Sequence, residues 1–280
     1  MSQLSAAAVS QQRVGSRAFG VAMKERRMIR WIAVVTLLSV AAISRAGTLT
    51  VAAAVSMKDA LVQVASDRKA AGKGEVEFVF GSSGQLEQQI LHGAPVDLFI
   101  SAGVKQMDRL QEKGAIDAAT RRDVASNRLV LIAPGESNIN AGSLADLDDS
   151  QVRRIAIGEP KTVPAGAYAF EALSNAGLSS LLADRIITAA NVRQVLGYVE
   201  RGEVNVGIVY ASDAKLSGDK VKIVCEIDPA LHAPIAFPAA VVARSPRAEE
   251  ARAFLHDLLA EPGQARLAEF GFAVPAESRK

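Results

Sequence analysis

Hydrophobic and polar positions divide the chain after residue 48 into short apolar runs that alternate with longer amphipathic segments. Residues 98–100 and 129–132 are continuously apolar, which is typical of parallel strands buried on both faces of a sheet. In the segment that follows residue 84, Leu86, Ile90 and Leu91 fall on one face of a helix. This alternation of strands and helices predicts an α/β architecture.

The pattern also predicts where each element lies. Strands are expected at residues 49–54, 76–80, 97–101, 129–133, 154–157, 204–210, 221–225 and 237–243. Helices are expected at residues 57–71, 85–92, 104–111, 165–176, 192–201, near 212–216, and over 248–270 with an interruption around Pro262-Gly263. Because proline cannot donate to a strand ladder, Pro238 indicates an edge strand or a strand start.

These elements suit two mostly parallel α/β lobes rather than one. We expect residues 47–126 with about 240–280 to form the first lobe and residues 127–239 to form the second. The chain would cross between the lobes near 126–127 and return near 238–243. The C-terminal helix would then pack on the first lobe.

The first 46 residues have the pattern of an N-terminal extension followed by a signal peptide. Four basic residues between Lys24 and Arg30 precede an apolar run over residues 31–43, and Ser44-Arg45-Ala46 supplies small residues for cleavage. The run is shorter than the roughly 20 apolar residues of a membrane span, although an uncleaved anchor is the alternative. We expect cleavage after Ala46 and a periplasmic protein.

Removing this segment changes the charge of the chain. Seven of the 32 Lys and Arg residues, but only one of the 30 Asp and Glu residues, lie within residues 1–46, so the remainder has a net charge of −4. This balance lacks the basic footprint of a nucleic-acid-binding protein. The single cysteine, Cys225, excludes an intrachain disulfide, and we expect it to be buried and inert.

Small or hydroxyl residues follow several predicted strands, where ligands of open α/β sheets bind. The turn of residues 81–84, Gly-Ser-Ser-Gly, leads into a helix and offers free backbone N–H groups, a hydroxyl and the positive end of a helix dipole. Ser82 and Ser83 compete for the hydroxyl role. The other candidate positions are Ser56, residues 100–103, the loop of residues 158–166, the helix start at residues 191–193, and Tyr210.

Each of these features alone is more often a helix cap or a packing residue, and their joint occurrence favours an oxyanion site. The sequence lacks the motifs that zinc binding, nucleotide binding and serine hydrolysis need. The three histidines, His92, His232 and His256, show no i, i+4 spacing, and neither a P-loop nor a G-x-S-x-G elbow is present. Asp59, Asp97 and Asp213 are interpreted as caps or surface ion pairs.

Several segments resemble the periplasmic molybdate-binding proteins of ABC importers. The most specific are the runs of residues 93–102 and 163–169, Gly-Ala-Pro-Val-Asp-Leu-Phe-Ile-Ser-Ala and Val-Pro-Ala-Gly-Ala-Tyr-Ala, and the likeness covers residues 48–275. Further matches are residues 52–56, 80–90, 191–193 and 207–214. The chain departs from many members at Gly103, where they carry an acidic residue, and at Gly84, where they often carry Ser or Thr.

The resemblance implies a two-lobed type II periplasmic-binding-protein fold with the ligand between the lobes. It implies hydroxyl ligands at Ser56, Ser83 and Tyr210 and backbone N–H ligands at Ser83, Ala102, Ala165 and Val192. These residues would bind molybdenum only as molybdate, or tungsten as tungstate, with no direct metal-ion ligand and no cofactor. The implied protein is a monomer that delivers the anion to a membrane permease and binds no nucleic acid.

Other functions remain open from the sequence. The same donors would suit sulfate or another tetrahedral oxyanion, because the sequence does not give the radius of the cavity. A secreted serine hydrolase that uses Ser83 is a different possibility, although no histidine and aspartate partnership is evident at a strand end. The effector domain of a transcription regulator shares the implied fold, but the leader and the missing DNA-binding module disfavour it. We expect a binding protein and not an enzyme.

Overall fold

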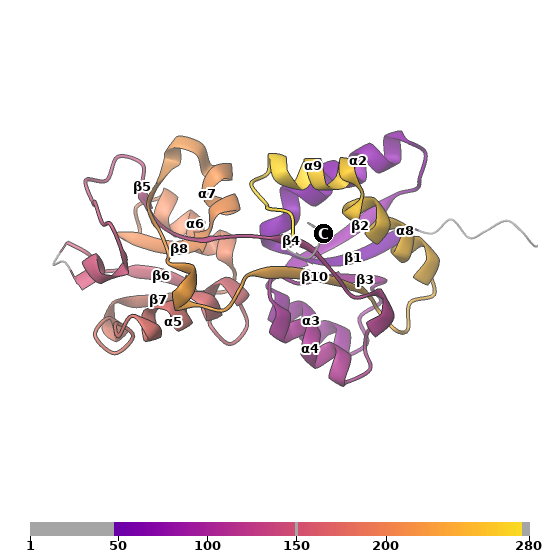
Figure 1. Cartoon of the computed structure of the whole chain (residues 1–280), viewed down its shortest axis with the longest axis horizontal. Coiled ribbons are helices and arrows are strands. Elements are labelled where there is room, and N and C mark those ends of the chain that lie inside the picture. Colours follow the sequence, from indigo (N-terminus) through magenta and orange to yellow (C-terminus); the bar gives the residue numbers. More distant parts are fainter. Residues whose placement is uncertain (1–47, 149–150, 276–280) are drawn as a thin grey trace, which may run out of the picture. The chain divides into compact units, whose positions relative to one another are not determined.

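The computed structural model describes residues 48–148 and 151–275 of the chain. These residues form two five-stranded sheets, and each sheet has helices on both faces (Figure 1). The predicted signal peptide and its cleavage site after Ala46 lie outside these residues. Within the described ranges, no helix is both long enough and apolar enough to cross a bilayer. The α/β architecture predicted from the sequence is confirmed.

The first sheet has the strand order β2-β1-β3-β10-β4. Its strands are β1 (Leu49–Ala54), β2 (Val76–Gly81), β3 (Leu98–Ile100), β4 (Arg122–Ser126) and β10 (Ala236–Val241). Strand β10 is antiparallel to both of its neighbours, so the other four strands run in one direction. The accompanying helices are α2 (Lys58–Ala70), α3 (Ser83–Leu91), α4 (Val104–Glu112), α8 (Ala248–Leu259) and α9 (Glu261–Glu269).

Helices cover this sheet on two sides because side chains alternate between the faces of a strand. Ala52 and Phe99 pack with Leu86 of α3 and Met107 of α4 in one cluster of buried residues. Their neighbours along the strands face the opposite cluster, which contains Leu61 of α2 and residues of α8 and α9. Figure 1 shows α3 and α4 on one side of the sheet and α2 and α9 on the other.

The second sheet has the order β7-β6-β8-β5-β9. Its strands are β5 (Leu129–Pro134), β6 (Ile155–Gly158), β7 (Ile186–Ala189), β8 (Val206–Tyr210) and β9 (Val221–Glu226), with helices α5 (Pro164–Asn175), α6 (Val192–Glu200) and α7 (Ala211–Ser217). Here β5 is the reversed strand. Residues 129–132 are buried as predicted, but the expectation of a parallel strand is wrong.

Short 3-10 helices occupy several connections in the described chain. They are η1 (Val55–Met57), η2 (Ala118–Thr120), η3 (Leu144–Asp148), η4 (Ala183–Arg185), η5 (Gly218–Lys220) and η6 (Pro229–Leu231). We use "first lobe" for the first sheet with α2, α3, α4, α8 and α9, and "second lobe" for the second sheet with α5, α6 and α7. Strand β4 was not predicted from the sequence, because its five residues mix charged and apolar side chains.

The chain passes from the first sheet to the second between Ser126 and Leu129. It returns between Glu226 and Ala236, a few residues before the expected segment 238–243. Pro238 therefore lies inside a central strand rather than at an edge or a strand start. It is accommodated at a bulge in the pairing of β10 with β4, and its carbonyl oxygen accepts from the N–H of Ser101 at 2.9 Å.

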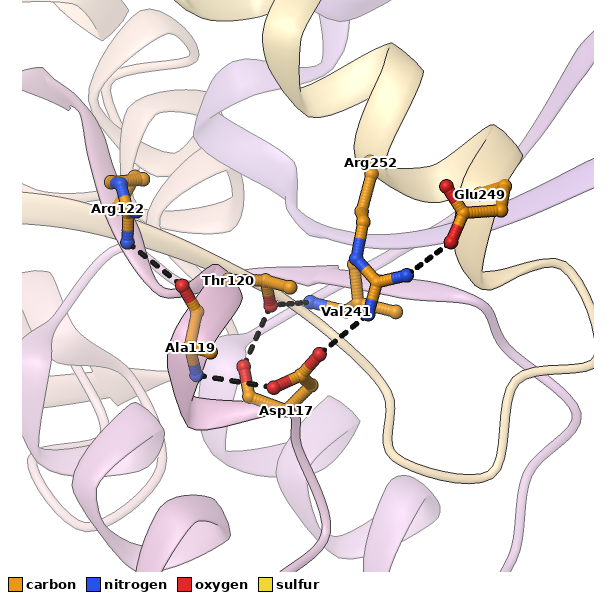
Figure 2. A network of polar contacts seen from close by, with 7 residues as sticks. All are labelled: Asp117, Ala119, Thr120, Arg122, Val241, Glu249 and Arg252. Atoms are coloured by element: carbon orange, nitrogen blue, oxygen red, sulfur yellow. Dashed lines mark hydrogen bonds and ion pairs between the residues drawn. The ribbon is translucent and has the colours of Figure 1, made fainter.

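A polar network fixes the connection between α4 and β4 onto β10 and α8 (Figure 2). The Oδ1 atom of Asp117 caps η2 by accepting from the N–H of Ala119, and its Oδ2 atom pairs with Arg252 at 2.8 Å. Thr120 accepts from the N–H of Val241 at 3.0 Å. Arg252 also pairs with Glu249, so one guanidinium lies between two carboxylates within the first lobe.

The C-terminal helices pack on the first lobe, as predicted. The Nε atom of Arg266 in α9 lies 2.7 Å from Oδ2 of Asp67 in α2. The break between α8 and α9 is at Ala260, two residues before the expected position, because Pro262 fits the first turn of α9. Cys225 is only half-buried on the edge strand β9, so the expectation of a buried cysteine is wrong. Partial burial raises the pKa of its thiol.

Candidate functional site

A small hollow lies where several strand ends and helix starts of the two lobes meet. It is nearly filled by its lining, with a cavity volume of about 10 Å³. The lining residues are Ala54, Val55, Ser56, Gly81, Ser82, Ser83, Ala102, Val163, Pro164, Ala165, Asn191, Val192 and Tyr210. All six residues named from the sequence as ligand candidates are in this set, so the structure brings them together around one hollow.

Four hydroxyl groups in this lining are buried, and those of Ser56, Ser83 and Tyr210 each have a different hydrogen-bonding state. The Oγ atom of Ser56, in η1 after β1, has no hydrogen-bond partner. The Oγ atom of Ser83 accepts from the N–H of Ala102 at 2.9 Å. The hydroxyl of Tyr210 donates to the carbonyl oxygen of Ala102 at 3.0 Å. Ala102 thus connects Ser83 in the first lobe to Tyr210 in the second.

Burial also fixes the protonation of the tyrosine. Desolvation raises the pKa of Tyr210 well above its ordinary value of 10. The phenol therefore keeps its proton at neutral pH and remains a hydrogen-bond donor. Its ring is held by Phe237, whose centroid lies 5.4 Å away.

Three helix N-termini contribute backbone N–H groups to the hollow. Ser83 and Val192 are the first residues of α3 and α6, and Ala165 is the second residue of α5. N–H groups in the first turn have no partner within the helix and lie at the positive end of its dipole. The structure thus places backbone donors at three of the four positions that the resemblance implies, while the N–H of Ala102 is already bonded to Ser83.

The structure separates the roles of the two adjacent serines. Ser82 is the N-cap of α3, and its Oγ atom accepts from the N–H of Gln85 at 3.4 Å. Asn191 caps α6 in the same way, accepting from the N–H of Gln194 at 3.0 Å. Because the cap occupies Ser82, the hydroxyl of Ser83 is better placed to reach a ligand.

No Lys, Arg, His, Asp or Glu side chain is among the residues that line the hollow. The arrangement is therefore a set of neutral donors: hydroxyl groups and N–H groups at helix starts. Such a set binds an anion through hydrogen bonds and dipoles without a formal counter-charge. Within the described ranges, no group of three or more His, Cys, Asp or Glu residues could hold a metal ion.

A charged cluster lies directly behind this neutral lining. Arg193, one residue after Val192, pairs through Nε with Oδ1 of Asp213 at 2.6 Å and through Nη2 with Oδ2 of Asp59 at 2.9 Å. Asp213 is fully buried, so the interpretation of this residue as a cap or surface ion pair is wrong. Burial raises the pKa of Asp213 to about 6, although Arg193 opposes the shift.

The other two aspartates have structural roles. Asp59 is half-buried in the first turn of α2, where its contact is the ion pair with Arg193. Asp97 is buried, and its carboxylate accepts from the N–H of Thr50 at 2.9 Å and from the hydroxyl of Ser245 at 2.7 Å. Sequence reasoning missed the Arg193 cluster. The available signal was that Asp59, Arg193 and Asp213 each follow a ligand candidate within three residues.

The geometry around Ser83 does not provide a general base. Its oxygen accepts from a backbone N–H, and no histidine is among the residues that line the hollow. His92, the histidine closest to Ser83 in the sequence, is exposed and bonds to the carbonyl oxygen of Gln88. An activated nucleophile needs a base within hydrogen-bond reach.

Fold and site together define a solute-binding protein, in which two α/β lobes meet around a small ligand site. The family model of bacterial extracellular solute-binding proteins matches residues 49–273. The chain therefore belongs to that family. It is 40% identical over 233 residues to the molybdate-binding protein ModA of Haemophilus influenzae, covering 81% of this chain and 90% of that protein.

Two further comparisons agree with this assignment. The molybdate-binding protein ModA of Escherichia coli is 37% identical over 239 residues, covering 83% of this chain and 91% of that protein. The solved periplasmic molybdate-binding protein of Azotobacter vinelandii superposes with a TM-score of 0.74 at 24% identity, covering 81% of this chain and 99% of that chain. At that identity the superposition supports the fold alone. The predicted periplasmic-binding-protein fold is confirmed.

Proposed function

We propose that this protein captures molybdate, and also tungstate, outside the cytoplasm and delivers it to the membrane permease of an ABC importer. The observation that carries the proposal is the convergence of the buried hydroxyls of Ser56, Ser83 and Tyr210 and three helix N-termini on one hollow with no charged side chain. The Oγ atom of Ser56 has no hydrogen-bond partner within the protein, so its hydroxyl is free to donate to a ligand. The relatives of known specificity bind molybdate.

The donor set fits the chemistry of this ligand. Molybdate carries no proton at neutral pH and can only accept hydrogen bonds. Hydrogen phosphate carries a proton and would need an acceptor, but the lining contains no carboxylate. Hydrogen bonds to a charged group contribute about 1.5–3 kcal/mol each, and several are needed to offset the lost hydration of a dianion.

Ligand binding would exchange hydrogen bonds within the site. The hydroxyl of Tyr210 would leave the carbonyl oxygen of Ala102 and donate to the anion instead. Ser83 would keep the N–H of Ala102 as its donor, which leaves its own O–H free to point at the ligand. Ser56 and the N–H groups of Ala165 and Val192 would add three further donors, while Ala102 would act through its hydrogen bond to Ser83.

We further infer that the protein is a carrier rather than a catalyst, a monomer, and without cofactor or nucleic-acid partner. The missing base beside Ser83 supports binding over hydrolysis. The pattern of residues 1–46 supports export to the periplasm with cleavage after Ala46. Closure of the two lobes around the anion would present both lobe surfaces to the permease.

Isothermal titration calorimetry of the exported protein with molybdate, tungstate, sulfate and phosphate tests the proposal. Tight one-to-one binding of molybdate and tungstate, with weak sulfate binding, is expected. Tight sulfate binding would support the donor site but show that the assignment of molybdate as the ligand is wrong. Absence of heat with all four anions would refute the proposed function. Labelling of Ser83 by a serine-reactive phosphonate would favour a hydrolase.

A further inference from the structure

Arg193 makes contacts in both lobes. In the second lobe its Nε atom pairs with the buried Asp213 of α7 at 2.6 Å. In the first lobe its Nη2 atom pairs with Asp59 of α2 at 2.9 Å and donates to the carbonyl oxygen of Ser56 at 3.1 Å. Arg193 itself is the second residue of α6, so one guanidinium joins four elements from the two lobes: η1, α2, α6 and α7.

Each member of this cluster is close in sequence to a residue of the site. Arg193 directly follows Val192, Asp59 is three residues after Ser56, and Asp213 is three residues after Tyr210. A shift of any of these charged groups would therefore also shift a hydrogen-bond donor of the oxyanion site. The contact with Ser56 is the most direct, because Arg193 binds the backbone of the residue whose hydroxyl lines the hollow.

We propose that Arg193 is a positioning residue that holds the two halves of the oxyanion site together, so that its ion pair with Asp59 slows release of the ligand. This inference rests on the proposed function and deepens it. Asp213 fixes the guanidinium from within its own lobe, since Asp213 is fully buried and the arginine is only 22% exposed. The planar fork then presents Nη2 to Asp59 and to the carbonyl oxygen of Ser56.

The consequence is a fixed separation between Ser56 and Val192. Both contribute donors from opposite lobes, and their distance sets the size of anion that can contact both. The guanidinium fixes this separation although Arg193 is not among the residues that line the hollow. Its positive charge is balanced by two carboxylates, so the hollow keeps its neutral donor character.

The test is Asp59→Asn, because Asp59 is half-buried and its replacement leaves the pair of Arg193 with buried Asp213 intact. The matched control is Asp117→Asn. Arg252 also lies between two carboxylates, Asp117 and Glu249, but all three belong to the first lobe (Figure 2). The asparagine keeps the oxygen that caps η2.

Release of radiolabelled molybdate is followed by rapid filtration after mixing with excess unlabelled tungstate. We expect about five-fold faster release in Asp59→Asn, with a smaller change in the association rate and no change in Asp117→Asn. Arg193→Lys should also release molybdate faster, because the ammonium group of lysine cannot reproduce the geometry in which the planar guanidinium pairs with Asp213 and Asp59 at once. Adding Asp59→Asn to Arg193→Lys should then have little further effect, since coupled residues are not additive.

Release from Asp59→Asn at the wild-type rate would overturn the proposal. Small-angle X-ray scattering of the ligand-free proteins provides a readout that does not depend on the ligand. Asp59→Asn should show a larger radius of gyration than wild type and Asp117→Asn, because the lobes are held together less tightly. If wild type bound no oxyanion, the proposed function would fail, and scattering would still decide whether Arg193 joins the lobes.

Discussion

The N–H of Gly84, at the start of α3, donates to the carbonyl oxygen of Thr162 in the second lobe at 2.9 Å. The two backbones approach so closely that a Cβ atom on residue 84 would lie 2.7 Å from that oxygen and 2.8 Å from the Cα atom of Thr162. Glycine therefore permits a contact between the lobes directly beside Ser83. Any side chain at this position would have to separate the lobes or shift the loop.

The first prediction concerns this contact. Gly84→Ala should lower molybdate affinity about ten-fold, because a displacement of the lobes weakens several donors at once. Titration calorimetry measures the change. Gly142→Ala is the control, since a Cβ atom there would meet only Asp146 at 3.7 Å. Wild-type affinity in Gly84→Ala would show that the closed contact with Thr162 is not needed for binding.

The second prediction separates binding from stability at the serines. Ser56→Ala removes a hydroxyl that has no partner, so we expect molybdate affinity to fall about 10- to 100-fold while the free energy of unfolding stays nearly constant. Ser83→Ala should reduce both quantities, because the buried N–H of Ala102 loses its acceptor at a cost of about 1–3 kcal/mol. Urea unfolding and calorimetry on both variants measure these effects. Unchanged affinity in Ser56→Ala would remove it from the site.

The third prediction concerns the tyrosine hydroxyl. Tyr210→Phe keeps the ring packed on Phe237 but loses a donor, so we expect about ten-fold weaker binding of molybdate. The ligand-free protein should lose about 1 kcal/mol of stability, the typical value of one hydrogen bond, here that with Ala102. Equal affinity of Tyr210→Phe and wild type would mean that this hydroxyl stays on Ala102 in the complex.

The fourth prediction is a pH dependence of stability from Asp213. Its pKa is about 6 in the folded protein against an ordinary 3.8, so the folded state binds the extra proton between these values. Protonation of Asp213 therefore stabilises the folded protein fully below pH 3.8. This stabilisation is lost as the pH rises through 6, and the free energy of unfolding falls by on the order of 3 kcal/mol. Arg193 and Asp59 are the charged groups that act on it.

Urea unfolding between pH 4 and pH 7 checks this sign. The difference in unfolding free energy between wild type and Asp213→Asn should decrease as pH rises. Asp67→Asn is the control, because a hydrogen bond from Arg266 lowers the pKa of Asp67 and gives the opposite sign. A difference between wild type and Asp213→Asn that does not vary with pH would contradict the prediction.

The sequence by itself determined the local structure of this protein. Apolar runs and amphipathic segments gave the α/β architecture, because the side-chain periodicities of strands and helices are properties of neighbouring residues. The small and hydroxyl residues after the strands indicated several candidate positions, and the resemblance to molybdate-binding proteins implied the particular set of Ser56, Ser83, Ala102, Ala165, Val192 and Tyr210. The structure places all of them around one hollow.

Only the tertiary structure decided which distant residues meet. The reversal of β5 and β10, the central position of Pro238 and the burial of Asp213 depend on pairings between segments far apart in sequence. Asp59 and Arg193 form their ion pair only when the two lobes come together, and no local pattern encodes that contact. Strand direction and ion pairing are set by the packing energy of the whole chain, whereas periodicity is set within each segment.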